Sequence, residues 1–188
     1  MTVKTDYSRF DIHDELTAPE DTARLLRSMS DAGGTVSKFV GVLAGSPATM
    51  RAFARMRHEL RDGDLPRPTS ERIALAVAQQ RGDTYSVAQH ARTARAAGLG
   101  LDEISLARSW NSNDPREAAM LTFLKSLFDA DERPAHHLLE EAREMDWTDE
   151  QLLEAVAHLA LNEFQSLISN AAALPQDQTD PTILPEAA

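Results

Sequence analysis

The sequence predicts an all-α fold. None of its 188 residues falls in a run with the period-two alternation of apolar and polar side chains that is typical of a strand. Consecutive β-branched residues are few, and glycine, proline and capping residues divide the chain into apolar stretches of helical length. A chain of this length fits one domain with a continuous core. We therefore expect one helical domain over residues 1–174 and an extended or mobile tail over residues 175–188.

Glycine, serine and proline set the helix boundaries in the first third of the chain. A glycine pair at positions 33 and 34 ends the first expected helix. Ser46 supplies an N-cap for the third helix, and Pro47 takes its first position. The expected helices are Pro19–Asp31, Val36–Leu43 and one from Pro47 toward Leu60, and the segment Asp62–Pro68 breaks the last of them.

A tight helical hairpin is expected next. Its first helix runs from Glu71 to Arg81 and ends at Gly82. Asp83 stands at the N-cap of the second helix, which closes at Gly98. The residues around this helix break include most of the polar side chains that could carry chemistry.

Two capping sequences mark the later helices. The letters DPRE at 114–117 combine an N-cap, a first-turn proline and an acidic residue at the third position. The letters TDEQ at 148–151 form a capping box before a long helix that reaches about Ala173. Between them, His136 and His137 are expected in an exposed connection.

The charge of the chain limits the classes of partner. A net charge of −11 and a pI near 4.9 repel a phosphate backbone and an anionic membrane surface, so neither nucleic acid nor membrane is an expected partner. A small neutral or cationic ligand, or another protein, stays open. No run resembles a signal peptide or reaches the length of a bilayer span, so we expect a cytoplasmic protein.

The chain has no cysteine. This excludes disulfides, thiolate metal ligands and every mechanism in which a thiol of this chain reacts.

Four blocks of sequence, taken in order, resemble the carboxymuconolactone decarboxylase and alkylhydroperoxidase D-like superfamily over roughly residues 20–174. The resemblance implies an all-α bundle that assembles as a homo-oligomer (a trimer, a hexamer or a dimer), with a site near a subunit interface. The blocks are GTVSKFVGVLAGSPATMRAF, LPRPTSERIALAVAQQRGDTYSVAQHARTARAAGL, DPREAAMLTFLKSL and TDEQLLEAVAHLALNEFQSLI.

The peroxidase branch of this superfamily has a glutamate, a C-x-x-C pair and a histidine at fixed spacing. Glu71 and His90 match the glutamate and the histidine, while the cysteine positions hold Asp83 and Ser86. Neither Asp83 nor Ser86 can cycle between thiol and disulfide, so this resemblance does not imply peroxidase activity.

The decarboxylase branch commonly shows a tyrosine, a glutamate and a tryptophan ahead of the same histidine. Tyr85 and His90 match this pattern, but Ser86 and Val87 stand where the glutamate and the tryptophan would be. The sequence therefore belongs to neither well-marked branch.

The residues themselves predict a proton-transfer site. Asp83, Ser86 and His90 lie at i, i+3 and i+7 and share one helix face. If the hairpin brings Glu71 to His90, the carboxylate orients an imidazole that acts as general base or acid. Tyr85 would donate a hydrogen bond to a substrate oxygen, and Ser86 and Asp83 would bind the substrate.

Each of these residues also has a structural interpretation. Asp83 is suited to cap its helix by accepting from the Ser86 amide, and Glu71 in a first turn favours the helix dipole. His90 is equally interpreted as a hydrogen-bonded structural residue, and Tyr85 as part of the core.

A polar line on the last helix is a second candidate. His158, Asn162, Gln165 and Ser169 follow steps of four, three and four residues. We expect His158 and Asn162 to line a substrate pocket, and the alternative is a solvent face or an oligomer seam. The family often has asparagine at the position of Asn162.

No metal or cofactor is expected. Glu71, Asp83 and His90 offer two carboxylates and an imidazole, but their spacing is no recognised ligand signature. Two functions from different classes follow. The first is a cofactor-independent lyase or isomerase acting on a small organic acid or lactone-type metabolite. The second is a non-catalytic oligomer that binds a ligand or partner.

Overall fold

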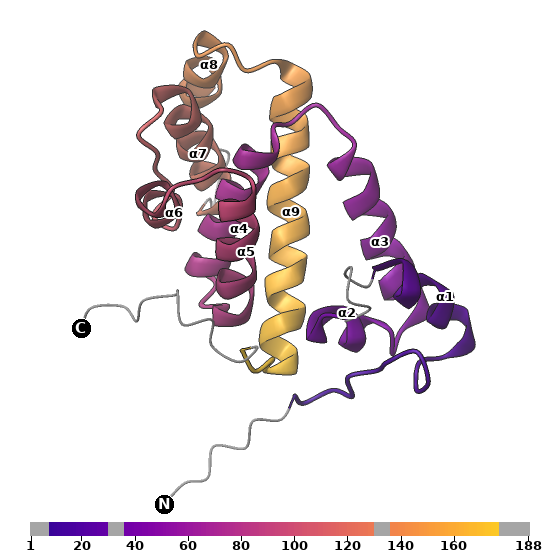
Figure 1. The fold of residues 1–188 in the computed structure, drawn as a ribbon. Helices are drawn as coiled ribbons and strands as arrows, with labels where there is room; N and C mark the ends of the chain where they lie inside the picture. Colours follow the sequence, from indigo (N-terminus) through magenta and orange to yellow (C-terminus); the bar gives the residue numbers. More distant parts are fainter. Residues whose placement is uncertain (1–7, 30–35, 130–135, 177–188) are drawn as a thin grey trace, which may run out of the picture. The chain divides into compact units, whose positions relative to one another are not determined.

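The computed structural model describes residues 8–29, 36–129 and 136–176, and in these ranges the chain forms nine helices and no strand (Figure 1). The all-α fold class is confirmed. The predicted helix end at Asp31 and the residues of the predicted tail beyond 176 lie outside the described residues. Within the described part, none of the helices combines the length and apolarity needed to span a bilayer.

The helices gather in two compact units, one from residues up to 58 together with 167 onward, the other from 59–166. The first unit holds α1 (Glu20–Met29), α2 (Lys38–Leu43) and most of α3 (Pro47–Arg61). Buried Thr22 on α1 donates to the carbonyl of Ala44 at 3.0 Å and so ties α1 to the end of α2. The extent of a single domain to residue 174 stays a prediction.

The predicted N-cap of α3 is present. The Ser46 side chain accepts from the Thr49 amide at 3.4 Å, with Pro47 as the first residue of α3. Ser37 caps α2 by accepting from the Val40 amide, which is why α2 begins two residues after the predicted start.

The second unit is built around α4 (Arg67–Gln80). Its stretch from Ile73 to Ala78 is at most 2% exposed, because five of these residues are small or β-branched and let neighbouring helices approach closely. The helix begins at Arg67, four residues before the predicted start at Glu71. Pro66 is its N-cap and Pro68 lies in the first turn, where the absent proline amide has no intrahelical partner to lose.

The predicted hairpin is present between α4 and α5 (Thr84–Ala96), which lie side by side (Figure 1). Gly82 has φ +63°, in the left-handed region that costs glycine little. Asp83 then caps α5 by accepting from the Ser86 amide at 3.0 Å. The break therefore fixes the positions of the polar residues on both sides of it.

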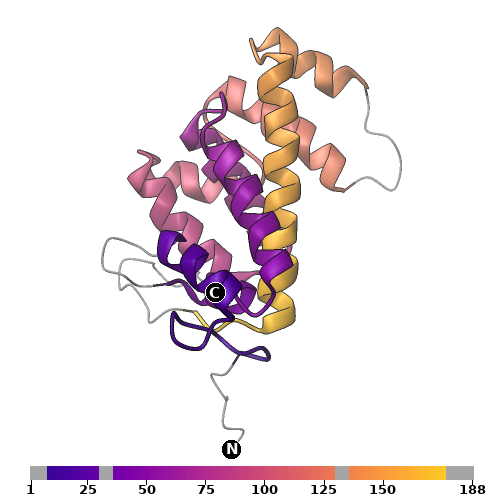
Figure 2. The ribbon, with the colours of Figure 1, turned by 90° about the vertical axis from the view of Figure 1, so that its right-hand side faces the viewer.

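The later helices complete this unit. The capping prediction at 114–117 is confirmed, since Asp114 accepts from the Arg116 amide at 2.9 Å. The capping box is reciprocal, with the Gln151 amide donating to Thr148 Oγ1 at 3.1 Å and the Thr148 amide to Gln151 Oε1 at 3.4 Å. The helices are α6 (Leu101–Ala107), α7 (Pro115–Phe128), α8 (His136–Glu144) and α9 (Asp149–Ala172), with α7 and α8 side by side (Figure 2).

Two of these helices, α6 and α8, were not predicted from the sequence. The segment Leu101–Ala107 has only seven residues and no side-chain cap, so it lacks the usual start signal. His136 and His137 begin α8 instead of lying in a connection, although His136 is exposed as predicted.

Candidate functional site

Glu71 on α4 and His90 on α5 are in contact. The His90 Nδ1 atom lies 3.0 Å from Glu71 Oε2, and the two side chains are 19% and 13% exposed. Because α4 begins at Arg67, Glu71 lies beyond the first turn, and the interpretation that it serves the helix dipole there is wrong. The geometry on which the proton-transfer hypothesis depends is therefore present.

Thr93 holds the same carboxylate from one turn further along α5. Its hydroxyl donates to Glu71 Oε2 at 2.6 Å. Burial alone raises the pKa of Glu71, but the hydrogen bond and charge of His90, with the hydrogen bond of Thr93, outweigh burial and bring the pKa below its ordinary value. Glu71 is thus an ionised carboxylate at neutral pH.

Gln165 on α9 occupies the other side of the imidazole. Its amide nitrogen lies 3.2 Å from His90 Nε2 and 3.2 Å from Ser86 Oγ. Since this amide group donates, Nε2 accepts and the ring proton lies on Nδ1, which donates to Glu71. The contacts therefore hold the imidazole in one orientation between a carboxylate and a carboxamide.

Asp83 and Ser86 are each 2% exposed in the first turn of α5. The predicted capping role of Asp83 is confirmed by its bond from the Ser86 amide. Its second oxygen, Oδ2, is buried without a hydrogen-bond partner. These two positions, which match the cysteines of the peroxidase branch, are polar and inaccessible to bulk water.

Tyr85 lies in the core, at 2% exposure. Five residues separate it from His90, which is a rotation of about 140° around the helix, so the two side chains leave α5 on different faces. The core interpretation fits this position, and a catalytic role for Tyr85 stays a prediction.

The residues of the polar line on α9 have different partners. The Asn162 amide donates to the His158 carbonyl of its own helix at 2.8 Å. Burial lowers the pKa of His158, against the opposing effects of a hydrogen bond with the Leu60 backbone and the charges of Glu154 and Glu71. Substrate binding by His158 and Asn162 stays a prediction, and Gln165 is the member of this line that reaches His90.

Two residues of the site, Gln165 and Thr93, were not predicted as site residues from the sequence. Thr93 follows His90 by three residues and so shares its helix face, which is a usable signal. Gln165 belonged to the predicted polar line, but nothing in the sequence marked it above its neighbours.

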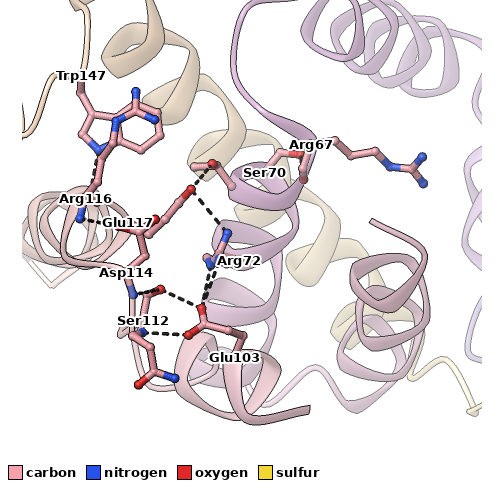
Figure 3. A network of polar contacts seen from close by, with 11 residues as sticks. Arg67, Ser70, Arg72, Glu103, Ser112, Asp114, Arg116, Glu117 and Trp147 are labelled. Carbon is pink, nitrogen blue, oxygen red and sulfur yellow. Dashed lines mark hydrogen bonds and ion pairs between the residues drawn. The ribbon is translucent and has the colours of Figure 1, made fainter. Parts of the chain in front are cut away.

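A second polar network surrounds Arg72, the residue after Glu71 (Figure 3). The Arg72 guanidinium donates to Glu103 Oε2 at 3.0 and 3.2 Å and lies 3.4 Å from Glu117 Oε1. Thr69 donates to the same Glu117 oxygen at 2.7 Å. Burial raises the pKa of Glu117 despite these contacts, and its Oε2 atom has no hydrogen-bond partner. This network joins α4, α6 and α7.

No three histidine, aspartate or glutamate side chains within the described residues are grouped closely enough to hold a metal ion. In particular, Asp83 is committed to the α5 cap, while Glu71 and His90 bind each other.

Residues 47–129 match the model of the carboxymuconolactone decarboxylase family. The family resemblance is confirmed. The matching region contains Glu71, Asp83, Ser86 and His90, whereas Gln165 lies beyond it. No curated protein matches the chain.

The fold is shared with solved structures of the alkylhydroperoxidase D type. An uncharacterized peroxidase-related protein from Ralstonia eutropha, described as an alkylhydroperoxidase AhpD core, has 23% identity and a TM-score of 0.81, covering 93% of this chain and 94% of its own. An uncharacterized peroxidase-related protein from Silicibacter sp. has 18% identity and a TM-score of 0.79, covering 95% and 96%. The debrominase Bmp8 in complex with 2,3,4-tribromopyrrole has 16% identity and a TM-score of 0.69, covering 86% and 87%. The alkylhydroperoxidase D-like helical fold is thereby confirmed.

Proposed function

We propose that this protein is a cofactor-independent lyase or isomerase in which His90 transfers a proton. The contact between Glu71 and His90 supports this most directly, since an ionised carboxylate on Nδ1 orients the ring and stabilises the imidazolium that forms. The proposed substrate is a small organic acid or lactone-type metabolite.

In the isomerase form of the reaction, His90 Nε2 takes a proton from a carbon next to a carbonyl group, and the electron pair of the broken C–H bond moves onto the carbonyl oxygen. In a substrate with a C=C bond next to that carbon, the enolate is conjugated. The imidazolium then returns the proton to the far carbon of the former double bond, so the double bond moves and no electrons are gained or lost. In the lyase form, a C–C bond breaks, carbon dioxide leaves, and an imidazolium protonates the carbanion. Neither reaction needs an electron acceptor, which is consistent with a chain that has no cysteine.

Gln165 must move for either reaction. Its amide nitrogen contacts the Nε2 atom that would exchange the proton. The substrate therefore displaces this contact on binding and takes over the hydrogen bond to the ring.

The test is deuterium incorporation or carbon dioxide release from a panel of small lactones and β-keto acids, followed by NMR. We expect His90→Ala to lower turnover at least about 100-fold, the usual contribution of a positioned acid or base. His136→Ala is the matched control, because His136 is an exposed histidine at the start of α8. Equal turnover by His90→Ala and the control would remove His90 from the mechanism.

A non-catalytic function is the second candidate, and one observation favours it. Glu71, His90, Gln165 and Ser86 bind one another, so the cluster is also consistent with a structural centre. In that case the protein would be a homo-oligomer that binds a ligand or partner, and wild-type protein would turn over none of the panel.

A further inference from the structure

Asp83 carries a buried oxygen that the fold leaves without a hydrogen bond. Oδ1 accepts from the Ser86 amide, while Oδ2 has no partner, and the residue is 2% exposed. Both oxygens belong to one carboxylate, so Oδ2 lies beside the same first turn of α5 that presents Ser86. A buried carboxylate oxygen is stable only when a donor reaches it.

The neighbouring groups include further acceptors. Ser86 Oγ and His90 Nε2 both accept from the Gln165 amide, and Glu71 is ionised on the far side of the ring. The carboxamide of Gln165 shows that a donating nitrogen fits between two of these acceptors. A second carboxylate brought against Asp83 would meet the negative charge of the Asp83 carboxylate.

We propose that this site selects a ligand group that donates a hydrogen bond, an N–H or O–H that is neutral or cationic, and that Asp83 Oδ2 receives it. The proposal rests on the proposed function, because it assigns a specificity residue to the same site. An organic acid can then be a substrate only if its carboxylate lies away from Asp83.

Two rings of equal size test this selection. 2-Pyrrolidinone presents a lactam N–H where γ-butyrolactone presents an ether-type oxygen, so the pair differs in one donor. The readout is the dissociation constant from NMR shifts of the Ser86 and His90 amides. We expect wild-type protein to bind the lactam about tenfold more tightly or better, which is the usual value of a hydrogen bond to a charged acceptor.

Asp83→Asn is the decisive variant. Asparagine keeps one oxygen to cap α5 and puts an amide nitrogen where Oδ2 was, so the helix start is preserved and the acceptor becomes a donor. We expect the preference for the lactam to vanish or reverse. Asp114→Asn is the matched control, since Asp114 caps α7 in the same way and should leave the preference unchanged.

The outcomes separate this proposal from the proposed function. Equal binding of the two rings by wild-type protein, binding of neither ring, or an unchanged preference in Asp83→Asn would overturn the role of Asp83. His90→Ala should keep the preference while losing turnover. Full turnover by His90→Ala would reject the proposed mechanism and leave the selectivity of Asp83 standing.

Discussion

His90 is held at both ring nitrogens, and each contact has a different consequence. Glu71 fixes the proton on Nδ1, and Gln165 covers the nitrogen that would act on a substrate. In the proposed reaction, the first contact orients the ring for proton transfer, and the second is given up before transfer begins. Both ring nitrogens of His90 therefore have a partner within this chain.

Thr93 provides a test at this scale. Thr93→Val keeps the shape of the side chain and removes the hydroxyl that donates to Glu71 Oε2. We expect the pKa of Glu71 to rise, because one of the interactions that lower it is lost. We also expect a loss of about 1 kcal/mol in the free energy of unfolding.

The pKa of Glu71 is measured by NMR titration of its ¹³C-labelled carboxyl group. Thr93→Ser, which keeps the hydroxyl, is the control. An unchanged pKa in Thr93→Val would show that the Thr93 hydrogen bond has no influence on the carboxylate.

Between helices, the network of Arg72 holds α4 in place. Arg72 reaches Glu103 on α6 and Glu117 on α7, and all three carry charge into the interior of the second unit. Trp147 adds a further link, since its indole nitrogen donates to the Arg116 carbonyl at 2.8 Å (Figure 3). Because Glu71 precedes Arg72 directly, this network also fixes the turn of α4 that presents the catalytic candidate.

The raised pKa of Glu117 gives a pH dependence with a definite sign. Between the ordinary pKa of glutamate and the raised folded value, the folded protein binds more protons than the unfolded chain, so the contribution of Glu117 to stability falls as pH rises. Glu117→Gln cannot titrate. We expect the unfolding free energy of wild-type protein, relative to this variant, to fall through that window by at most about 1.4 kcal/mol per pH unit.

Urea denaturation at a series of pH values measures this difference. The variant keeps an oxygen to accept from Thr69, so its fold should survive. A difference that rises with pH, or that stays constant, would mean that Arg72 governs Glu117 more strongly than burial does.

On the scale of the whole molecule, charge and assembly are linked. The family resemblance implies a homo-oligomer, and each chain carries a net charge of −11, so copies repel one another at low salt. We expect a trimer, hexamer or dimer by size-exclusion chromatography with light scattering. The association should strengthen toward about 1 M salt, where the screening length is about 3 Å. A monomer at every salt concentration would contradict this prediction.

Local signals in the sequence predicted most of the fold. Capping residues such as Ser46, Asp83 and Asp114 act on amides two or three positions away, so their effect is visible in the sequence itself. The start of α4 and the short helix α6 were not predicted, because neither begins with a side-chain cap. The glycine and prolines of the segment Asp62–Pro68 predicted a break that extends to Pro68, whereas α4 already begins at Arg67. The helix Leu101–Ala107 has no side-chain cap that would mark its start in the sequence.

The candidate site shows what local signals leave open. The helical fold, the exclusion of thiol chemistry and the shared face of Asp83, Ser86 and His90 all follow from the order of the residues. Helix packing in the folded chain brings Glu71 into contact with His90 and places Gln165, 75 residues after His90, on the other side of the ring. The physical reason is that helical periodicity orders residues within one helix, whereas contacts between helices depend on how their buried faces pack.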